Sequence, residues 1–274
     1  MRFWSFVFTA LLLLPQAQAD QSVQRIISLA PHATELAFAA GLGNKLVGAT
    51  DYSDYPEEAK NIERVANYQG IKLERIMALK PDLIIAWPKG NPAKEIAKLK
   101  QLGFKFYNSE VNTLDDIATN IEALSQYADD PQQGKQAAEA FRERLNALKS
   151  QHSGLTPVRY FYQLSEKPII TLAQDSWPSE VFRFCGGENI FENSSTPYPQ
   201  VGIEQVLIAK PDVIFTSEHA IANGSMWLRW KDQIPAVEQG HVWSLNADWI
   251  NRSTPRTLNA IEEVCHYFEQ VRNN

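Results

Sequence analysis

The sequence predicts an α/β protein of two similar lobes, joined by one long rigid helix and enclosing a ligand cleft between them. A unit of short helix, Lys-Pro-Asp and apolar strand occurs at 73–84 and again 130 positions later at 203–214. A second self-similarity relates 35–44 to 180–189, which share Glu, Gly and Asn at a constant offset of 145. One β/α unit repeated in both halves indicates two lobes of one architecture.

The N-terminus matches an export signal. Arg2 is followed by an apolar run at 3–14 and by Ala17-Gln18-Ala19, the order of charged, hydrophobic and cleavage regions in a signal peptide. A membrane-spanning helix needs about 20 apolar residues, so this shorter run does not predict an anchor or any direct membrane insertion. We expect a signal peptide at 1–19, cleavage after Ala19 and a mature protein outside the cytoplasm.

The predicted N-terminal lobe, 20–129, alternates short apolar strands with helices. Proline fits the first position of a helix and glycine commonly follows its end, so Pro31 and Gly41 are expected to delimit the first helix. Pro31 and His32 are expected on the loop after the first strand, the usual ligand edge of an α/β sheet. The predicted strands are 25–29, 45–49, 82–86 and 104–108, the later helices 92–102 and 114–127, and the polar-aromatic loops 51–56, 66–70 and 87–90.

The segment 130–156 is predicted to be a connecting helix. Asp130 is a favourable N-cap and Pro131 suits the first helical position. About 20 helical residues span about 30 Å, and a flexible linker would be rich in Gly and Ser instead. One face carries the apolar residues Ala137, Phe141, Leu145 and Leu148.

The predicted C-terminal lobe, 157–274, repeats the pattern of the first. Its Pro-Tyr-Pro loop at 196–199 stands where the first lobe has its Tyr-rich loop. Cys185 and Cys265 both lie in this lobe, and an even pair of cysteines outside the cytoplasm favours a structural disulfide over a metal site. The predicted elements are strands 158–164, 212–216 and 241–245, the Trp-rich segment 227–230, the loop 246–255 and a helix at 256–271.

Charge and motifs exclude several functions. The net charge is −6 without a basic stripe, which argues against a nucleic-acid partner or an anionic membrane. The sequence at 41–43 lacks the third glycine of a dinucleotide fingerprint, and the five histidines show no zinc-like spacing. We therefore expect no catalytic residues, no metal site, no prosthetic group and no enzymatic activity.

Aromatic residues recur on loops that follow strands in both halves. Each alone is as readily explained by packing, but their shared placement favours a site for a large, flat, partly polar ligand. Asp248 and Arg252 are candidates for directional polar contacts; the alternative is a surface salt bridge between them. The aromatic residues that follow strands are Tyr52, Trp87 and Trp249, and Tyr68 and Tyr198 lie on neighbouring loops.

Glu74 and Glu204 occupy equivalent positions in the first turns of the two repeated helices. A lone glutamate there usually complements the helix dipole. Two equivalent glutamates, one in each lobe, are also suited to two basic groups on a two-fold symmetric partner, where such pairs set docking register and association rate.

Taken together, these residues closely resemble the periplasmic cobalamin (vitamin B12)-binding proteins of bacterial ABC importers. The resemblance covers essentially the whole mature chain. It implies the helical-backbone class of substrate-binding proteins, whose two α/β lobes move little on binding. The segments that carry it are 34–41 (TELAFAAG), 52–56 (YSDYP), 73–75 (LER), 78–82 (ALKPD), 185–191 (CGGENIF), 199–201 (PQV), 248–249 (DW) and 253–256 (STPR).

The resemblance implies roles for individual residues. Glu74 and Glu204 would contact arginines on the two subunits of an inner-membrane ABC permease dimer, which works with its ATPase subunits, and the two cysteines would form a disulfide. The protein would be a periplasmic monomer before docking, with cobalamin as its transported ligand. The implied corrinoid contacts are Tyr52, Trp87, Asp248, Trp249 and Arg252.

Four positions depart from the family pattern. Tyr68 and Tyr198 replace tryptophan, and Ile170 replaces an aromatic residue. His32 replaces a small residue; its imidazole is expected to hydrogen-bond a ligand amide or to remain a solvated loop side chain, with cobalt ligation as the alternative. A siderophore or haem receptor of the same architecture is the alternative function, and a corrinoid-modifying enzyme or metallochaperone would need ligand clusters that the sequence lacks.

Overall fold

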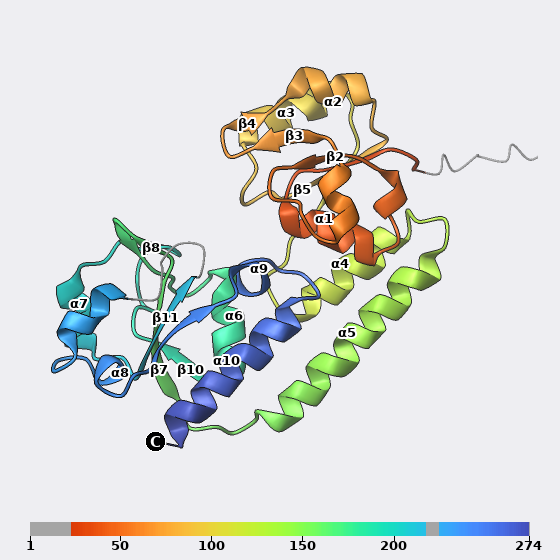
Figure 1. Ribbon diagram of the computed structural model, residues 1–274. Coiled ribbons are helices and arrows are strands. Elements are labelled where there is room, and N and C mark those ends of the chain that lie inside the picture. Colours follow the sequence, from red (N-terminus) through yellow and green to blue (C-terminus); the bar gives the residue numbers. More distant parts are fainter. Residues whose placement is uncertain (1–22, 218–224, 274) are drawn as a thin grey trace, which may run out of the picture.

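The computed structural model describes residues 23–217 and 225–273. The predicted signal peptide and its cleavage site lie outside these residues. Two α/β lobes stand one above the other, and the long helix α5 (Pro131–Gln151) runs along one side from the first lobe to the second (Figure 1). This arrangement confirms the fold class predicted from the sequence.

The first lobe is built on a six-stranded sheet in the order β4-β3-β2-β1-β5-β6, parallel except for β4. Neighbouring side chains of one strand point to opposite faces of the sheet. On one face Ile26 packs with apolar residues of α1 and α4, and on the other face Ile27 packs with apolar residues of α2 and α3. The elements are β1 (Ile26–Ser28), α1 (Pro31–Ala39), β2 (Leu46–Thr50), β3 (Arg64–Asn67), β4 (Gly70–Ile71), α2 (Leu73–Leu79), β5 (Leu83–Ala86), α3 (Ala93–Gln101), β6 (Phe106–Asn108) and α4 (Asp115–Ser125).

The second lobe has a parallel four-stranded sheet in the order β10-β7-β11-β12. Tyr160 and Phe182 stack at 4.2 Å in the core beneath α6 and α10, while Phe161 faces the buried Trp227 on the opposite side. The elements are β7 (Val158–Gln163), β8 (Ser165–Glu166), β9 (Ile169–Ile170), α6 (Trp177–Phe184), β10 (Gly187–Asn189), α7 (Ile203–Ala209), β11 (Val213–Ser217), α8 (Pro235–Glu238), β12 (Val242–Leu245), α9 (Ala247–Ile250) and α10 (Thr257–Arg272).

The repeated Lys-Pro-Asp unit has the same structure in both lobes. Lys80 and Lys210 each end their helix in the left-handed conformation, with φ 48°. The carboxylate of Asp82 then accepts a hydrogen bond from the backbone N–H of Arg25, and that of Asp212 accepts one from Arg159. Each aspartate thus ties the start of its own strand to the first strand of its sheet, which confirms the internal duplication.

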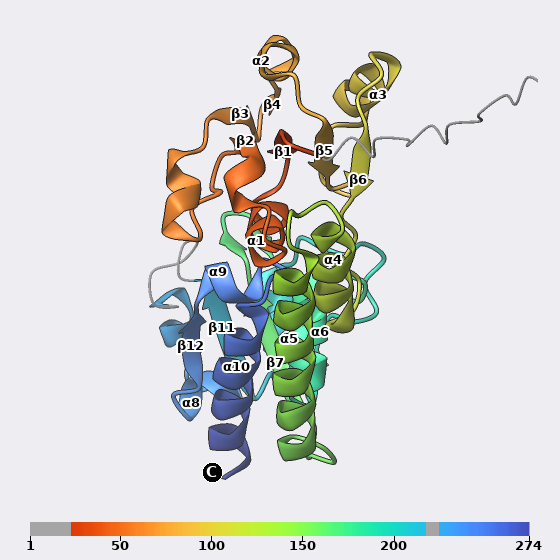
Figure 2. The same cartoon turned by 90° about the vertical axis from the view of Figure 1, so that its right-hand side faces the viewer.

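Helix α5 joins the lobes through side chains as well as through the chain. The Asp130 carboxylate accepts a hydrogen bond from the backbone N–H of Gln132, which confirms the predicted N-cap. The 21 residues of α5 correspond to about 30 Å at 1.5 Å per residue. Arg142 bonds Glu122 on α4, and α5 lies beside α10 in the second lobe (Figure 2).

One buried hydrophobic cluster runs through both lobes. It includes Ile26 and Leu36 of the first lobe, Phe141 of α5, and Tyr160 and Phe268 of the second.

The predicted disulfide between Cys185 and Cys265 is also present and fully buried, linking the end of α6 to α10. The second lobe is therefore fastened internally, while the core is shared across the molecule.

Three local predictions were wrong. The segment 66–70 is not a loop, because β3 and β4 form a tight antiparallel hairpin there. His32 is not a solvated loop residue: Pro31 begins α1 at once, so His32 is its second residue and only 8% exposed. The segment 246–255 is not a loop throughout, because the short helix α9 lies within it and contains Trp249. In all three places a helix or strand occupies part of a segment predicted to be a loop.

Candidate ligand-binding site

The carboxyl ends of both parallel sheets face a cleft between the lobes. Loops after parallel strands emerge at one edge, the usual ligand edge of such sheets. The cleft has a volume of about 510 Å³. Its lining residues are Pro31, His32, Trp87, Lys89, Val111 and Asn112 of the first lobe, and Asp175, Ser176, Trp177, Glu180, Arg183, Pro197, Tyr198, Asn251, Arg252 and Ser253 of the second.

Trp87 is held in place by the loop that follows β5. The Asn91 side chain accepts a hydrogen bond from the Trp87 backbone N–H at 2.7 Å and donates one to the Leu29 carbonyl at 2.8 Å. The indole lies over Gly90, where a Cβ atom would come within 2.0 Å of the ring. Glycine at this position therefore lets the indole fold over the loop while 39% of the residue stays exposed.

His32 meets Trp87 edge to face, with ring centroids 5.4 Å apart. Burial lowers the pKa of the imidazole from 6.5 to about 4, and the nearby positive charge of Arg252 acts in the same direction. The side chain is therefore neutral at neutral pH. A neutral imidazole carries one N–H donor and one nitrogen lone pair, so it can hydrogen-bond a ligand or coordinate a metal carried by a ligand.

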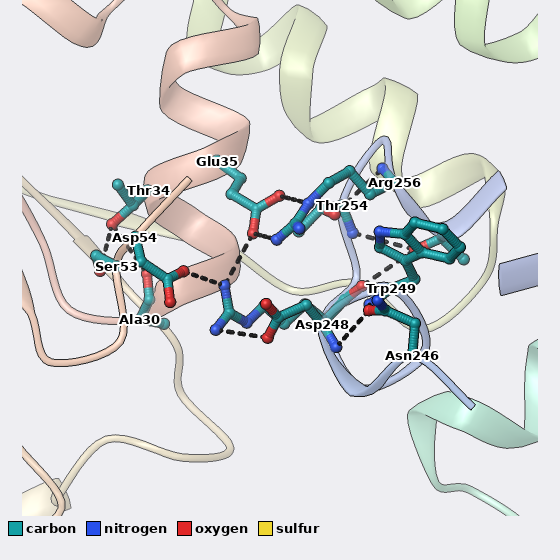
Figure 3. Close-up of polar contacts among 12 residues, drawn as sticks. Ala30, Thr34, Glu35, Ser53, Asp54, Asn246, Asp248, Trp249, Thr254 and Arg256 are labelled. Atoms are coloured by element: carbon teal, nitrogen blue, oxygen red, sulfur yellow. Dashed lines mark hydrogen bonds and ion pairs between the residues drawn. The ribbon is translucent and has the colours of Figure 1, made fainter. Parts of the chain in front are cut away.

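A cluster of charged groups joins the two lobes behind the cleft (Figure 3). Arg252 donates to Asp54 at 2.7 Å and to Glu35 at 3.3 Å, both in the first lobe, and pairs with Asp248 of its own lobe at 2.9 Å. Arg256 binds Glu35 with two hydrogen bonds. These five side chains bridge the lobes with charge-assisted hydrogen bonds, which are the strong ones among side chains.

The cluster favours the charged forms of Asp54 and Arg252. Burial opposes the charged form of Asp54, but the hydrogen bond and positive charge of Arg252 outweigh it and lower the pKa of the carboxyl. Burial likewise opposes the charge of Arg252, and its acidic neighbours, Asp54 first, raise the pKa of the guanidinium. Asp248 and Arg252 are thus ion-paired to each other, within a partly buried interlobe network.

The structure places four of the predicted ligand contacts on the cleft and five elsewhere. His32, Trp87, Tyr198 and Arg252 line it. Tyr52 lies in the turn after β2 and Tyr68 in the hairpin turn between β3 and β4, with 72% and 88% of their surface exposed. The remaining three are Ile170 in β9, and Asp248 and Trp249 in α9.

Several residues of this region were missed by the sequence reasoning. Glu35 was noted only as part of the internal repeat, although a glutamate amid apolar helix residues signals a buried partner. Trp177 stands at the start of α6 and lines the cleft beside Tyr198. Its position just before Pro178, at a helix start, was the available signal.

The candidate docking glutamates lie on separate lobes. Glu74 and Glu204 are both exposed in the first turns of α2 and α7. Within 23–217 and 225–273, no helix combines the length and apolar character needed to cross a membrane. The same residues contain no group of three or more His, Cys, Asp or Glu placed to hold a metal ion.

Known proteins resemble this chain along most of its length. The periplasmic binding protein family model matches residues 26–248. A vitamin B12-binding protein of Vibrio parahaemolyticus is 63% identical over 93% of this chain and 92% of its own length. One from Yersinia pestis is 44% identical over 96% of this chain and 91% of its own.

Solved structures give the same grouping. The periplasmic vitamin B12-binding protein of Vibrio cholerae superposes with a TM-score of 0.89 at 62% identity, over 92% of this chain and 99% of that one. A periplasmic haem-binding protein of the same organism reaches a TM-score of 0.76 at 18% identity, covering 89% and 98% of the two chains, and shows only the shared fold. The chain therefore belongs to the periplasmic binding protein family and, within it, groups with the vitamin B12-binding proteins.

Proposed function

We propose that this protein captures cobalamin in the cleft between its lobes and delivers it to an ABC transporter. The observation that carries the proposal is a cleft lined from both lobes, with Trp87 and His32 from the first lobe and Trp177 and Tyr198 from the second. Rings on both walls suit a large, flat macrocycle with polar edges. The relatives named for vitamin B12 binding, similar over nearly the whole chain, support this choice of ligand.

The positions of His32, Trp87, Tyr198 and Arg252 on the cleft lining support roles for these four residues, and the roles of the other five rest on the resemblance to cobalamin-binding proteins. Trp87, Tyr198 and Arg252 contact the corrinoid directly, and His32 forms a hydrogen bond with one of the corrinoid's amides. Tyr52 and Tyr68 project from the same sheet edge and meet the ligand where it extends beyond the cleft. Asp248, Trp249 and Ile170 complete the predicted contacts from the second lobe.

Delivery requires a membrane partner. Glu74 and Glu204 each meet an arginine on one subunit of a dimeric inner-membrane permease that works with ATPase subunits. Their support is their equivalent exposed positions in two duplicated lobes. The protein acts as a periplasmic monomer after cleavage behind Ala19, with lobes at 20–129 and 157–274 around the connecting segment 130–156.

The protein performs no chemistry on its cargo. Cobalamin is the transported ligand rather than a prosthetic group, and the chain serves neither as a corrinoid-modifying enzyme nor as a metallochaperone. Its cleft instead offers ring faces and hydrogen-bonding groups, which hold a ligand reversibly.

Calorimetric titration with cyanocobalamin, haem and a ferric siderophore in parallel tests the proposal. We expect heat and one-to-one binding with cyanocobalamin alone. Binding of haem or the siderophore without cyanocobalamin would assign the protein to the alternative receptor class. Trp87→Ala should weaken cyanocobalamin binding at least tenfold, while Trp243→Phe, a change within β12 and outside the cleft lining, should not.

A further inference from the structure

Lys89 and Asn112 form a polar pair on the first-lobe wall of the cleft. Both side chains line it, and the Lys89 ammonium donates a hydrogen bond to the Asn112 side chain at 2.5 Å. The two residues come from different loops, one after β5 and one after β6, so neighbouring parallel strands bring them together.

The hydrogen bond fixes which way the Asn112 amide points. An ammonium group only donates, so the atom facing Lys89 is the amide oxygen, and the amide NH₂ is left with two unused donors. Lys89 itself retains two N–H groups beyond the one it gives to Asn112. The pair therefore presents a positive charge and several donors to the cleft, the chemistry that binds an anionic oxygen.

Both loops are held in position by their own hydrogen bonds. The Asp116 carboxylate accepts hydrogen bonds from the backbone N–H groups of Asn112 and Thr113 at 2.9 and 2.8 Å. On the other loop, the backbone N–H groups of Gly90 and Asn91 both donate to the Trp87 carbonyl. Because these loops are already ordered, a ligand that meets the pair orders mainly the two side chains.

The charges of the rest of the cleft direct an anion to this pair. Arg252 is matched by three carboxylates, and Arg183 pairs with Glu180. Among the described residues, Lys89 is thus the cleft-lining cation whose partner is a neutral group. Asp175 lies in the second-lobe part of the lining, so an anionic group is repelled there and attracted toward Lys89.

We propose that Lys89 and Asn112 are the subsite for the phosphodiester of the ligand's nucleotide loop, an inference that rests on the proposed function. A phosphodiester carries one negative charge at neutral pH and exposes two anionic oxygens. Cobalamin has this group, whereas cobinamide lacks the whole nucleotide loop. The pair therefore favours complete cobalamins over cobinamides and sets the orientation in which the corrin enters the cleft.

Binding of two corrinoids to matched variants tests the subsite. Lys89→Gln keeps a polar side chain, one atom shorter, and removes its charge; it should weaken cyanocobalamin binding about 3- to 10-fold, as expected for a partly solvated charged hydrogen bond. Dicyanocobinamide should bind this variant as it binds the unaltered protein. Asn112→Asp places a carboxylate beside Lys89. It should weaken the binding of cyanocobalamin by more than Lys89→Gln does and leave the binding of dicyanocobinamide unchanged.

Lys94→Gln is the matched control, because Lys94 is an exposed lysine of α3 that does not line the cleft. It should leave both affinities unchanged. Equal weakening of the two corrinoids by Lys89→Gln, or no weakening of either, would overturn the subsite while leaving cobalamin capture intact. An unaltered protein that binds neither corrinoid would overturn the proposed function, and the subsite with it.

Discussion

The Arg256 guanidinium donates two hydrogen bonds to the Glu35 carboxylate, from Nε at 2.9 Å and from Nη2 at 2.6 Å. The glutamate belongs to α1 of the first lobe and the arginine to the start of α10 in the second. Glu35 is only 4% exposed. A buried bidentate pair therefore fixes the two lobes at the back of the cleft.

Removing the charge of Glu35 should destabilise the whole molecule. Glu35→Gln leaves the Arg256 guanidinium buried without its anion, a change that costs about 3 kcal/mol in the free energy of unfolding. Urea denaturation measures this quantity. Glu262→Gln is the matched control, since its pair with Arg144 is about half exposed and contributes less than about 1 kcal/mol. Equal effects of the two changes would contradict a stabilising role for the interlobe pair.

The disulfide should make a large contribution to stability. Cys185 and Cys265 are 80 positions apart, and closing a loop of this length restricts the unfolded chain by about 4 to 5 kcal/mol in the loop-entropy model. We expect the Cys185→Ser, Cys265→Ser double variant to lose stability of this order in urea. Reductant should destabilise the unaltered protein and leave the double variant unchanged; any further effect on the variant would count against the assignment.

Acid should weaken the fold through His32. Its folded pKa of about 4 lies below the ordinary 6.5, so the folded state binds the proton less tightly than the unfolded state. The contribution of the neutral imidazole is complete above pH 6.5 and is lost as pH falls toward about 4, a total of about 3 kcal/mol.

Urea denaturation near neutral pH and near pH 4.5 measures this loss. In His32→Asn the difference between the two pH values should shrink by about 2 to 3 kcal/mol. His266→Asn, which changes an exposed histidine, should keep the full difference. If both variants retained the same acid sensitivity, another group would be responsible.

Absorption spectra should decide how His32 meets the ligand. A histidine that only hydrogen-bonds a corrin amide leaves the cobalt environment unchanged, so aquocobalamin bound to the unaltered protein and to His32→Ala should give the same spectrum. Coordination of cobalt by the imidazole would shift the bands of the first complex alone. We expect identical spectra, which would eliminate cobalt ligation.

The docking glutamates should separate transport from binding. Glu74→Ala with Glu204→Ala should leave cyanocobalamin affinity unchanged, because neither side chain lines the cleft, and should impair uptake by cells that depend on this protein. Glu139→Ala, an exposed change on α5, is the control with normal uptake. Loss of cyanocobalamin binding in the double variant would remove the docking role.

The duplicated scaffold was predictable because its signals are local. Lys-Pro-Asp ends a helix and begins a strand within a few residues, and Asp130 with Pro131 starts α5. The strands β4, β8 and β9 contain two residues each, too few for any periodic pattern. They form only because a neighbouring strand supplies the hydrogen bonds.

The site was predictable only in part, because only its local signals can be recognised in the sequence. Trp87 follows a predicted strand, so its place at the sheet edge could be inferred, and Tyr198 lies on a loop that matches the Tyr-rich loop of the first lobe. Glu35 and Arg256 are 221 positions apart, and the local sequence around each residue does not indicate that the other is its partner. Asn112 could be recognised as a candidate site residue only from the structure, in which the sheet places it beside Lys89.

The hydrophobic cluster that passes from the first lobe through α5 to the second bears on how the two lobes can move. Each lobe also has a buried cluster of its own, around Ile27 in the first and around Phe161 in the second. Because the shared cluster includes Phe141 of α5, the lobes cannot part along this helix without exposing apolar surface to water. The connecting helix is therefore part of the hydrophobic core as well as the covalent link between the lobes.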